Sequence, residues 1–319
     1  MEAVIADSAT ELFTASVAQV LRGGETAAPR GLPTREVLGA HLVLSAPRRR
    51  LVDVPPVRVL NPAFAVAEAV WILAGSDDDW IFRFNRRLCE FADGGVLRGA
   101  YGPRLRRWGG QVDQLDQVRR LLTADPSTRR AVVQLFDPAL DFAGHRDVPC
   151  TIGYRFSVRA GRLHMHTTMR SQDLWLGLPY DVFTATVLQE LLAGWLGVGL
   201  GSYHHHVDSL HLYHQDLDAA GRLAEVEAPT GEELAPLAVA WPDVDRRLAQ
   251  LVAGEQLAEP GWDELSVVLA SYLAWKAGRR AEARSMLDGR GRVLTEALSR
   301  WYDRLAGPAE LTPAGEVAR

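Results

Sequence analysis

The stretch Asp147-Val148-Pro149-Cys150-Thr151 decides how the rest of the chain is interpreted. About twenty residues later comes Arg170-Ser171-Gln172-Asp173, followed shortly by Leu176-Gly177-Leu178-Pro179-Tyr180-Asp181. His211-Leu212-Tyr213 lies about thirty residues further on. A lone cysteine in a globular chain is more often a small buried hydrophobic residue than a nucleophile. A preceding proline and a loop context nevertheless make Cys150 a candidate nucleophile.

In order and spacing, these four segments resemble the motifs P-C, R-S-x-D, L-G-x-P-x-N and H-x-Y of the thymidylate synthase family. The resemblance extends over about residues 30–215. One departure stands out, because the asparagine that recognises the pyrimidine in the family is Asp181 here. In this respect the chain resembles the deoxycytidylate hydroxymethylase branch of the family.

The resemblance assigns the central chemistry to two side chains. Cys150 is implied to add as a thiolate to carbon 6 of a pyrimidine nucleotide, which makes carbon 5 nucleophilic. A nearby cation should lower the pKa of the thiol, and Arg170 is the candidate. Glu68 opens a segment, Glu68 to Trp71, that matches the E-x-x-W of the family, and it is implied to organise water and proton transfers. Without the resemblance, a glutamate in this apolar helix would more often be a partly exposed helix residue.

The phosphate of a nucleotide needs fixed cations, and guanidinium groups bind phosphate oxygens in pairs. By resemblance, one ligand is a loop arginine, for which we favour Arg30 and keep Arg35 as the alternative. Two adjacent arginines before a strand are implied to reach into the site of a partner subunit, so we expect a homodimer. The predicted phosphate ligands are Arg30, Arg129, Arg130, Arg170 and Ser171.

Four more residues take roles only through the resemblance. Asp173 is implied to lie near the pyrimidine and the folate, and Tyr101 to contact the folate. His211 and Tyr213 resemble the pair that binds the sugar hydroxyl, and residues two apart on a strand project to the same face. The implied co-substrate is 5,10-methylenetetrahydrofolate.

The aspartate at position 181 changes the hydrogen-bonding pattern that the site offers to a base. An asparagine amide can donate to the 4-carbonyl of uracil and accept from its N3–H, whereas an ionised aspartate can only accept. Cytosine carries an amino group at carbon 4, from which an ionised Asp181 can accept a hydrogen bond. A proton on Asp181 or on N3 of cytosine could supply the hydrogen bond at N3. A site built for one pattern leaves buried groups unpaired with the other base. Asp181 therefore favours cytosine.

The fate of the one-carbon unit separates two reactions. A thymidylate synthase reduces the exocyclic methylene with hydride from the folate, whereas a hydroxymethylase adds water to it. In thymidylate synthases a tryptophan some twenty residues after the helix glutamate shields this intermediate, and an ungapped count places Glu90 there, next to Phe91. We also find neither the final strand nor the short apolar tail of the family. Both features favour hydration.

The resemblance implies an α+β protein of thymidylate synthase-like fold, a mixed sheet packed with helices, in a single domain over residues 1–319. Hydrophobic periodicity and turn residues predict where its elements lie. The motif core covers about residues 30–215, and a helical extension covers about residues 217–310. The last residues, 312–319, should be flexible. We expect helices over 8–22, 63–73, 111–123, 180–196, 244–252, 262–277, 281–287 and 293–305, strands over 37–44 and 131–136, a hairpin of 152–158 with 163–169, and a loop over 25–35.

Composition narrows the function classes. The chain has 319 residues with 47% hydrophobic residues, enough for a substantial core, and its net charge of -5 does not favour nucleic acid as a partner. Its two cysteines form neither a disulfide framework nor a zinc pattern. Three consecutive histidines, His204-His205-His206, should alternate between faces of a strand, which argues against a metal site. With no signal peptide and no membrane span expected, a cytoplasmic protein is the default.

We therefore predict an enzyme that hydroxymethylates carbon 5 of deoxycytidylate or cytidylate. A thymidylate synthase acting on deoxyuridylate is the main alternative, and a nucleotide-binding relative without catalytic activity is a third possibility. Cytidylate and deoxycytidylate stay open, because the motifs concern the 3'-hydroxyl and not the 2' carbon. A role in modified phage DNA and one in a nucleoside natural product are both compatible with the sequence.

Overall fold

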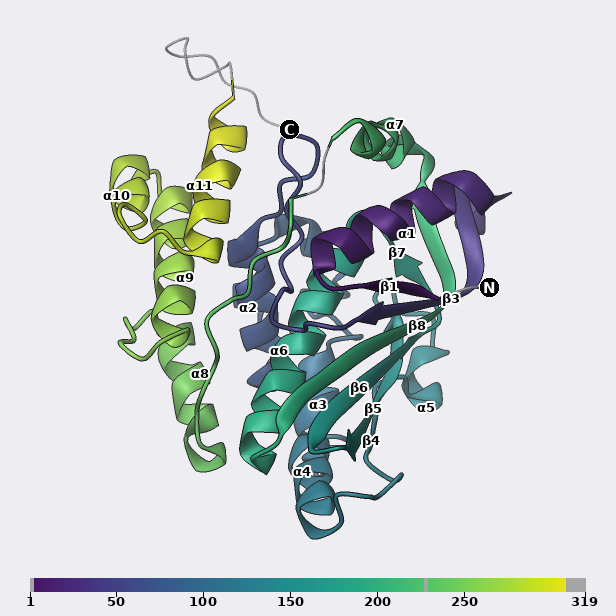
Figure 1. Ribbon diagram of the computed structural model, residues 1–319, viewed down its shortest axis with the longest axis vertical. Helices are drawn as coiled ribbons and strands as arrows, with labels where there is room; N and C mark the ends of the chain where they lie inside the picture. The colour runs from purple at the N-terminus through teal and green to yellow at the C-terminus, as the bar shows by residue number, and fades with distance from the viewer. Residues whose placement is uncertain (1–2, 227–228, 308–319) are drawn as a thin grey trace.

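The computed structural model describes residues 3–226 and 229–307, and a mixed eight-stranded sheet lies at its centre (Figure 1). The strand order is β1-β3-β8-β6-β5-β4, with β2 paired to β3 and β7 paired to β8. β3 and β5 run antiparallel to their neighbours β8 and β6, whereas β8 and β6 are parallel to each other. The strands are β1 Val4–Ala6, β2 Glu25–Ala27, β3 Thr34–Leu44, β4 Val132–Gln134, β5 Thr151–Arg159, β6 Arg162–Met169, β7 Gln172–Asp173 and β8 Gly199–Tyr213.

Helices form the remaining layers, and together with the mixed sheet they confirm the predicted α+β class. The α-helices are α1 Ala9–Gly23, α2 Pro62–Leu73, α3 Tyr101–Arg106, α4 Gln114–Ala124, α5 Pro138–Asp141, α6 Leu178–Leu196, α7 Leu217–Gly221, α8 Val244–Val252, α9 Trp262–Lys276, α10 Arg280–Ser285 and α11 Val293–Ala306. Short 3-10 helices cover Pro29–Gly31, Asp79–Arg83, Arg86–Phe91, His214–Asp216, Arg222–Glu225 and Trp241–Asp243.

Helices α2 and α6 carry apolar residues on all sides, and other elements cover both of them. α6 packs on β6 and β8, and α2 packs between α6 and α9, so that the layers run sheet, α6, α2, α9 (Figure 1). A helix that is hydrophobic all round belongs in a core. Asn61 caps α2 by accepting from the amides of Ala63 and Phe64, which fixes where the helix begins. Within α2, Glu68 is the residue that is not fully buried.

Several boundaries differ from those predicted, and three of the differences concern the sheet. The stretch 25–35 is not all loop, because β2 pairs with the first residues of β3 and β3 already begins at Thr34. β4 is shorter than the predicted strand, because only Val132–Gln134 pair with β5. β8 is much longer than the histidine and sugar-site motifs indicated, because it spans β3 on one side and β6 and β7 on the other.

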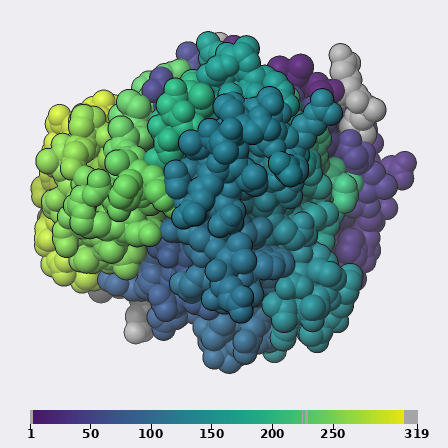
Figure 2. All heavy atoms as spheres, turned by 90° about the horizontal axis from the view of Figure 1, so that it is seen from below, coloured from purple at the N-terminus to yellow at the C-terminus, as the bar shows by residue number. Residues whose placement is uncertain are grey.

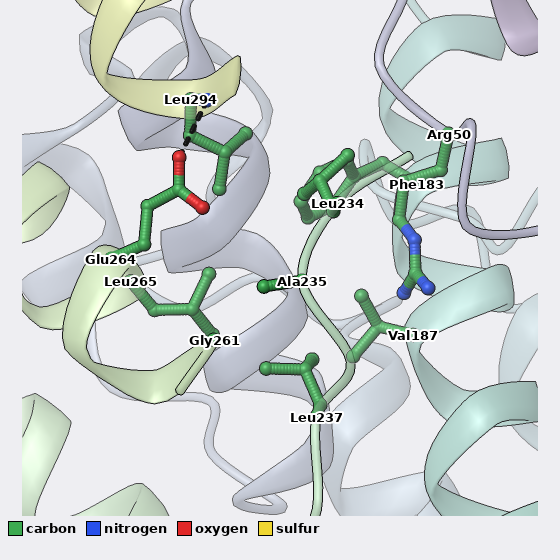
Figure 3. A pocket seen from close by; sticks show the side chains of 10 residues that line it. All are labelled: Arg50, Phe183, Val187, Leu234, Ala235, Leu237, Gly261, Glu264, Leu265 and Leu294. Carbon is green, nitrogen blue, oxygen red and sulfur yellow. Dashed lines mark hydrogen bonds between the residues drawn. The ribbon is translucent and has the colours of Figure 1, made fainter. Parts of the chain in front are cut away.

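The helices after residue 243 form a lobe beside the motif core (Figure 2). An extended segment, residues 229–240, leads to this lobe. The buried side chains of Arg50 and Glu190 form an ion pair, and Glu190 also accepts from the amide of Leu237 at 3.1 Å. A buried ion pair adds little net free energy to folding, but removing one partner would destabilise the fold because the other charge would stay buried without compensation. Figure 3 shows the adjoining pocket, lined by Arg50, Phe183, Val187, Leu234, Ala235, Leu237, Gly261, Glu264, Leu265 and Leu294.

The three consecutive histidines separate as the strand alternation predicts. His205 is 0% exposed, whereas His204 and His206 lie half-buried and stack with His41 and His166. No group of three or more His, Cys, Asp or Glu side chains suited to a metal ion is found within residues 3–226 and 229–307. In the same residues, no helix is both long and apolar enough to cross a membrane. Residues 312–319, predicted to be flexible, lie outside the described residues.

Candidate active site

The β5–β6 hairpin brings the candidate nucleophile and its arginine together. Cys150 directly precedes β5, Arg170 directly follows β6, and the Arg170 amide donates to the Cys150 carbonyl at 3.0 Å. The Arg170 side chain donates from Nε to the carbonyl of Pro149 at 2.9 Å and from Nη2 to that of Val148 at 3.1 Å. Nη2 also lies 3.8 Å from Cys150 Sγ. The guanidinium is therefore fixed beside the thiol, as the sequence predicted.

Burial, however, outweighs the effect of that guanidinium on the thiol. Desolvation raises the pKa of Cys150 above its ordinary value, while Arg170 lowers it and the carboxylates of Asp181 and Asp147 raise it further. Arg170 thus lowers the pKa of the thiol as predicted, although burial keeps that pKa above its ordinary value. Arg30 also lowers the pKa of Cys150, which places its charge within reach of the nucleophile.

Burial raises the pKa values of both Glu68 and Asp181, and the charge of Asp181 raises that of Glu68 further. Desolvation raises the pKa of Asp181 to about 6. Desolvation and then the Asp181 charge raise the pKa of Glu68 to about 8. Near pH 7, Asp181 is therefore mostly ionised and Glu68 mostly protonated. Two neighbouring carboxyl groups with separated pKa values can take an acid and a base role in one site.

Asp181 lies near the start of α6, where its carboxylate is held by a residue that the sequence did not single out. Gln172 Nε2 donates to Asp181 Oδ2 at 2.8 Å, and this bond lowers the pKa of Asp181 against the effect of burial. Gln172 occupies the variable position of the R-S-x-D motif, so the motif gave no reason to notice it. Tyr154, in β5, was also missed: it is buried, and the charges of Asp181 and Glu68 both raise its pKa.

Tyr101 lies closer to the nucleophile than its predicted folate contact suggested. Its hydroxyl accepts from the amide of Thr151, the residue after Cys150, at 3.1 Å. Burial and then the charges of Asp181 and Cys150 raise the pKa of Tyr101. The structure therefore places this hydroxyl beside the segment that carries Cys150. Its contact with the folate stays a prediction.

Strand β7 aligns the other predicted ligands with β8. Asp173 pairs with His211, and Asp173 Oδ1 accepts from the amides of Trp175 at 2.8 Å and Leu176 at 2.9 Å. His211 and Tyr213 project from one face of β8, with ring centroids 5.2 Å apart. Their predicted sugar contact is therefore sterically reasonable, although it stays a prediction.

The two candidate loop arginines lie in different surroundings. Arg30 is exposed in the 3-10 helix Pro29–Gly31 with a φ of 55°, whereas Arg35 lies in β3 and donates to the Gly24 carbonyl at 3.2 Å. The pairing of Thr34 with Tyr213 brings the Arg30 loop to the end of β8. These facts favour Arg30 over Arg35.

Arg129 and Arg130 are exposed between α4 and β4. Within residues 3–226 and 229–307, no hydrogen bond or ion pair joins either arginine to Cys150, Arg170 or Ser171. A role in the site of the same subunit therefore has no support, and the predicted role in a partner's site stays a prediction. Ser171 is partly exposed beside Arg170, where its predicted phosphate contact also stays a prediction.

The cysteine, the fixed guanidinium and the two carboxyl groups together form the candidate active site. Residues 11–235 match the protein family described as Thymidylate synthase. The chain belongs to the thymidylate synthase family.

Curated relatives carry two different descriptions. The chain is 35% identical over 224 residues to the "Deoxyuridylate hydroxymethyltransferase" of Bacillus phage SP01, covering 66% of this chain and 58% of that protein. It is 32% identical over 170 residues to the "Thymidylate synthase" of Symbiobacterium thermophilum, covering 48% of this chain and 59% of that protein. It is 32% identical over 176 residues to the "Deoxyuridylate hydroxymethyltransferase" of Pseudomonas phage M6, covering 54% of this chain and 50% of that protein. The matches thus span between half and three fifths of these relatives.

Proposed function

We propose that the protein is a hydroxymethyltransferase that transfers a one-carbon unit from 5,10-methylenetetrahydrofolate to carbon 5 of a cytosine nucleotide, deoxycytidylate or cytidylate. The observation that carries this proposal is Asp181, a carboxylate held by Gln172 at the position where the family has an asparagine. Its pKa of about 6 leaves it ionised near neutral pH, where it accepts hydrogen bonds from an amino group and has no proton for a carbonyl.

The side chains divide the work of this reaction. The Cys150 thiolate adds to carbon 6 of the base, and carbon 5 then forms a bond to the one-carbon unit that the folate supplies. Glu68, mostly protonated near pH 7, is placed to deliver and receive protons. Loss of the carbon 5 proton and of tetrahydrofolate leaves an exocyclic methylene. Water adds to that methylene and Cys150 departs, which gives the 5-hydroxymethyl nucleotide and intact tetrahydrofolate.

The residues present suit a folate co-substrate. A pterin ring presents N–H donors, and Asp173 offers a mostly buried carboxylate whose Oδ1 is held by two backbone amides. No hydrogen bond to the other oxygen of Asp173 is found in the described part of the chain. Asp173 and Tyr101 would hold the folate against the nucleotide, and Asp173 would fix the orientation of its ring.

The phosphate would bind to guanidinium groups from two subunits. Arg170 and Arg30 lie on the Cys150 side of the molecule, and Ser171 adds a hydroxyl beside Arg170. Arg129 and Arg130, which are exposed, would come from the second subunit of a homodimer. His211 and Tyr213 would bind the 3'-hydroxyl of the sugar. This arrangement makes each site dependent on both copies of the chain.

Two rival reactions, both on deoxyuridylate, have specific support. Two relatives described as deoxyuridylate hydroxymethyltransferases favour deoxyuridylate with the same hydration step, and the relative described as a thymidylate synthase favours methylation. A protonated Asp181 offers one donor and one acceptor, as an asparagine does, so it could bind uracil below pH 6. At neutral pH the ionised form dominates, and we therefore place cytosine first.

A substrate competition tests the proposal. The protein is incubated at pH 7.5 with methylenetetrahydrofolate and equal amounts of cytidylate, deoxycytidylate, uridylate and deoxyuridylate. The masses of the nucleotide products are then measured by mass spectrometry. We expect CH2O to be added to a cytosine nucleotide, and the product will also identify the sugar. Addition of CH2O to deoxyuridylate would refute the base assignment. Addition of CH2 with formation of dihydrofolate would show a thymidylate synthase.

Replacing Glu68 with glutamine should lower kcat about 100- to 10,000-fold, the usual contribution of a general acid or base. In the wild-type protein, kcat/KM should rise with pH as the Cys150 thiol ionises, and this rise should level off above about pH 8, because Glu68 then loses the proton that it has to deliver. In Glu68→Gln the residual activity should continue to rise above pH 8. The measurement is the dependence of kcat/KM on pH between 6 and 9.5.

Glu264→Gln is the matched control. Glu264 is also a buried carboxyl with a pKa raised by desolvation, but it lies in α9 and accepts from the amide of Leu294 at 2.7 Å (Figure 3). Its replacement should leave the pH profile unchanged. If the profile of Glu68→Gln still levelled off near pH 8, the assignment of that titration to Glu68 would be wrong.

A further inference from the structure

A continuous chain of buried polar side chains leads away from Asp181 into the sheet. Gln172 in β7 lies 2.9 Å through Oε1 from His205 Nε2 in β8, and His205 Nδ1 lies 2.7 Å from the hydroxyl of Tyr203. That hydroxyl is also 2.9 Å from Thr167 Oγ1 in β6. All four side chains are at most 2% exposed. These side chains therefore have to satisfy one another's hydrogen bonds, because solvent has almost no access to them.

One main-chain carbonyl fixes the direction of the hydrogen bonds. Gln172 Nε2 lies 2.8 Å from Asp181 Oδ2 and 3.2 Å from the carbonyl of Asp173, and a carbonyl can only accept. The amide nitrogen must therefore point towards Asp181 and the amide oxygen towards His205. His205 must then donate from Nε2, and its Nδ1 lies beside the Tyr203 hydroxyl. Burial lowers the pKa of His205 to about 3, so the ring is neutral and has only one proton to place.

The turn before α6 is shaped to allow this contact. A Cβ atom on Gly177 would lie 2.6 Å from Gln172 Nε2 and 3.4 Å from Asp181 Oδ2. Any other residue at this position would therefore push the amide away from the carboxylate. Gly177 also donates its amide to the Asp173 carbonyl at 3.0 Å, the same carbonyl that orients Gln172. The backbone and the side-chain network are thus built around one contact.

We propose that Gln172 is a positioning residue for base recognition, which ties Oδ2 of Asp181 and leaves Oδ1 as the oxygen that meets the substituents of a pyrimidine. The inference rests on the proposed function in naming a pyrimidine as the ligand. In the described residues no hydrogen bond to Oδ1 is found, whereas Oδ2 has its donor. A proton taken up by Asp181 therefore resides on Oδ1, where it would be presented to the base.

Other groups near Asp181 act on its charge and must stay unchanged in a test. Gln172 stabilises the ionised form, whereas Asp173 destabilises it, and burial is the largest effect. Asp181 in turn raises the pKa values of its neighbours. The titratable groups that interact with Asp181 are Glu68 from α2, Tyr101 from α3, Cys150 and Tyr154 at the start and in the middle of β5, Asp173 from β7 and Tyr203 from β8.

The test is the titration of Asp181 in the ligand-free protein. The carboxyl carbons of aspartate are labelled with 13C, and the Asp181 signal is identified by its absence from Asp181→Asn. Gln172→Met keeps the length of the side chain but removes the donor. We expect the titration midpoint to rise by about one pH unit or more, which is the effect of losing one hydrogen bond to a carboxylate. An unchanged midpoint would overturn the proposal.

Gln189→Met is the matched control. Gln189 is also a fully buried glutamine, but its amide donates to the carbonyls of Leu163, Gly201 and Ser202. Its replacement should leave the Asp181 midpoint in place, and an equal shift in both variants would reduce Gln172 to a general packing role. If Gln172→Met does not fold, Gln172→Glu keeps the acceptor for His205 and removes the donor, with the same expected direction.

The failure of this inference can be told apart from the failure of the proposed function. The titration needs neither substrate nor turnover, so it would still report on Gln172 if the protein hydroxymethylated a uracil nucleotide. Where the wild-type protein does prefer cytidylate, Gln172→Met should reduce the ratio of kcat/KM for cytidylate over uridylate at pH 7 by about tenfold or more, because more Asp181 is then protonated. A preference that stays unchanged while the midpoint shifts would overturn the link to base recognition.

Discussion

Replacing Cys150 with alanine is expected to reduce turnover at least about 10,000-fold, because no other group on the site can form the bond to carbon 6 of the base. Nucleotide binding should survive, since the arginines and Asp181 stay in place. The assay measures the hydroxymethyl product by mass spectrometry and the affinity for the nucleotide by calorimetry. Substantial residual product would remove Cys150 from the mechanism.

Cys89→Ala supplies the internal control for this experiment. Cys89 is the other cysteine of the chain and is exposed in the 3-10 helix Arg86–Phe91. Its loss should leave the rate unchanged. The pH dependence adds a second criterion, because burial raises the pKa of Cys150 above its ordinary value. The free thiol is then mostly protonated at pH 7, and the rate of covalent addition should rise with pH until Glu68 begins to lose its proton.

Much of the site could be predicted because its residues lie in motifs with fixed spacing. Cys150 and Arg170 are far apart in sequence, yet the hairpin of β5 and β6 brings them together, and the hairpin follows from alternating strands on either side of a glycine turn. The apolar runs around Glu68 and Asp181 likewise predicted the two buried helices. Local patterns therefore identified both the elements and the residues on them.

The electrostatics and the supporting residues could not be predicted in the same way. The raised pKa of Cys150 depends on how deeply the finished fold buries the thiol, which local sequence does not report. Gln172 and His205 lie in different motifs, and only the pairing of β7 with β8 brings their side chains into contact. The short pairing of β2 with β3 was missed for the same reason, because a Pro- and Gly-rich stretch gives little sign of a strand.

Replacing Asp181 with asparagine is expected to reverse the base preference, with the ratio of kcat/KM for cytidylate over uridylate falling by about 100- to 10,000-fold. Gln172 Nε2 donates to Oδ2 of Asp181, so it would hold the oxygen of an asparagine amide there and turn the amide NH2 towards the base. That NH2 can donate to the 4-carbonyl of uracil but cannot accept from the 4-amino group of cytosine. The ratio is measured by competition with both nucleotides present. Asp181→Ala serves as the control, because it should weaken both bases without reversing the preference.

The effect of pH on this ratio is an independent criterion for the same residue. In the wild-type protein, the preference for cytosine should increase as the pH rises through about 6, because the ionised Asp181 has no proton to donate to a uracil carbonyl. Below that pH the protonated carboxyl resembles an amide, and the ratio should decline towards the value of the asparagine variant. Asp181→Asn should show no such change between pH 5 and 7. If the wild-type ratio were constant over that range, or if cytosine preference survived in Asp181→Asn, another group would have to recognise the base.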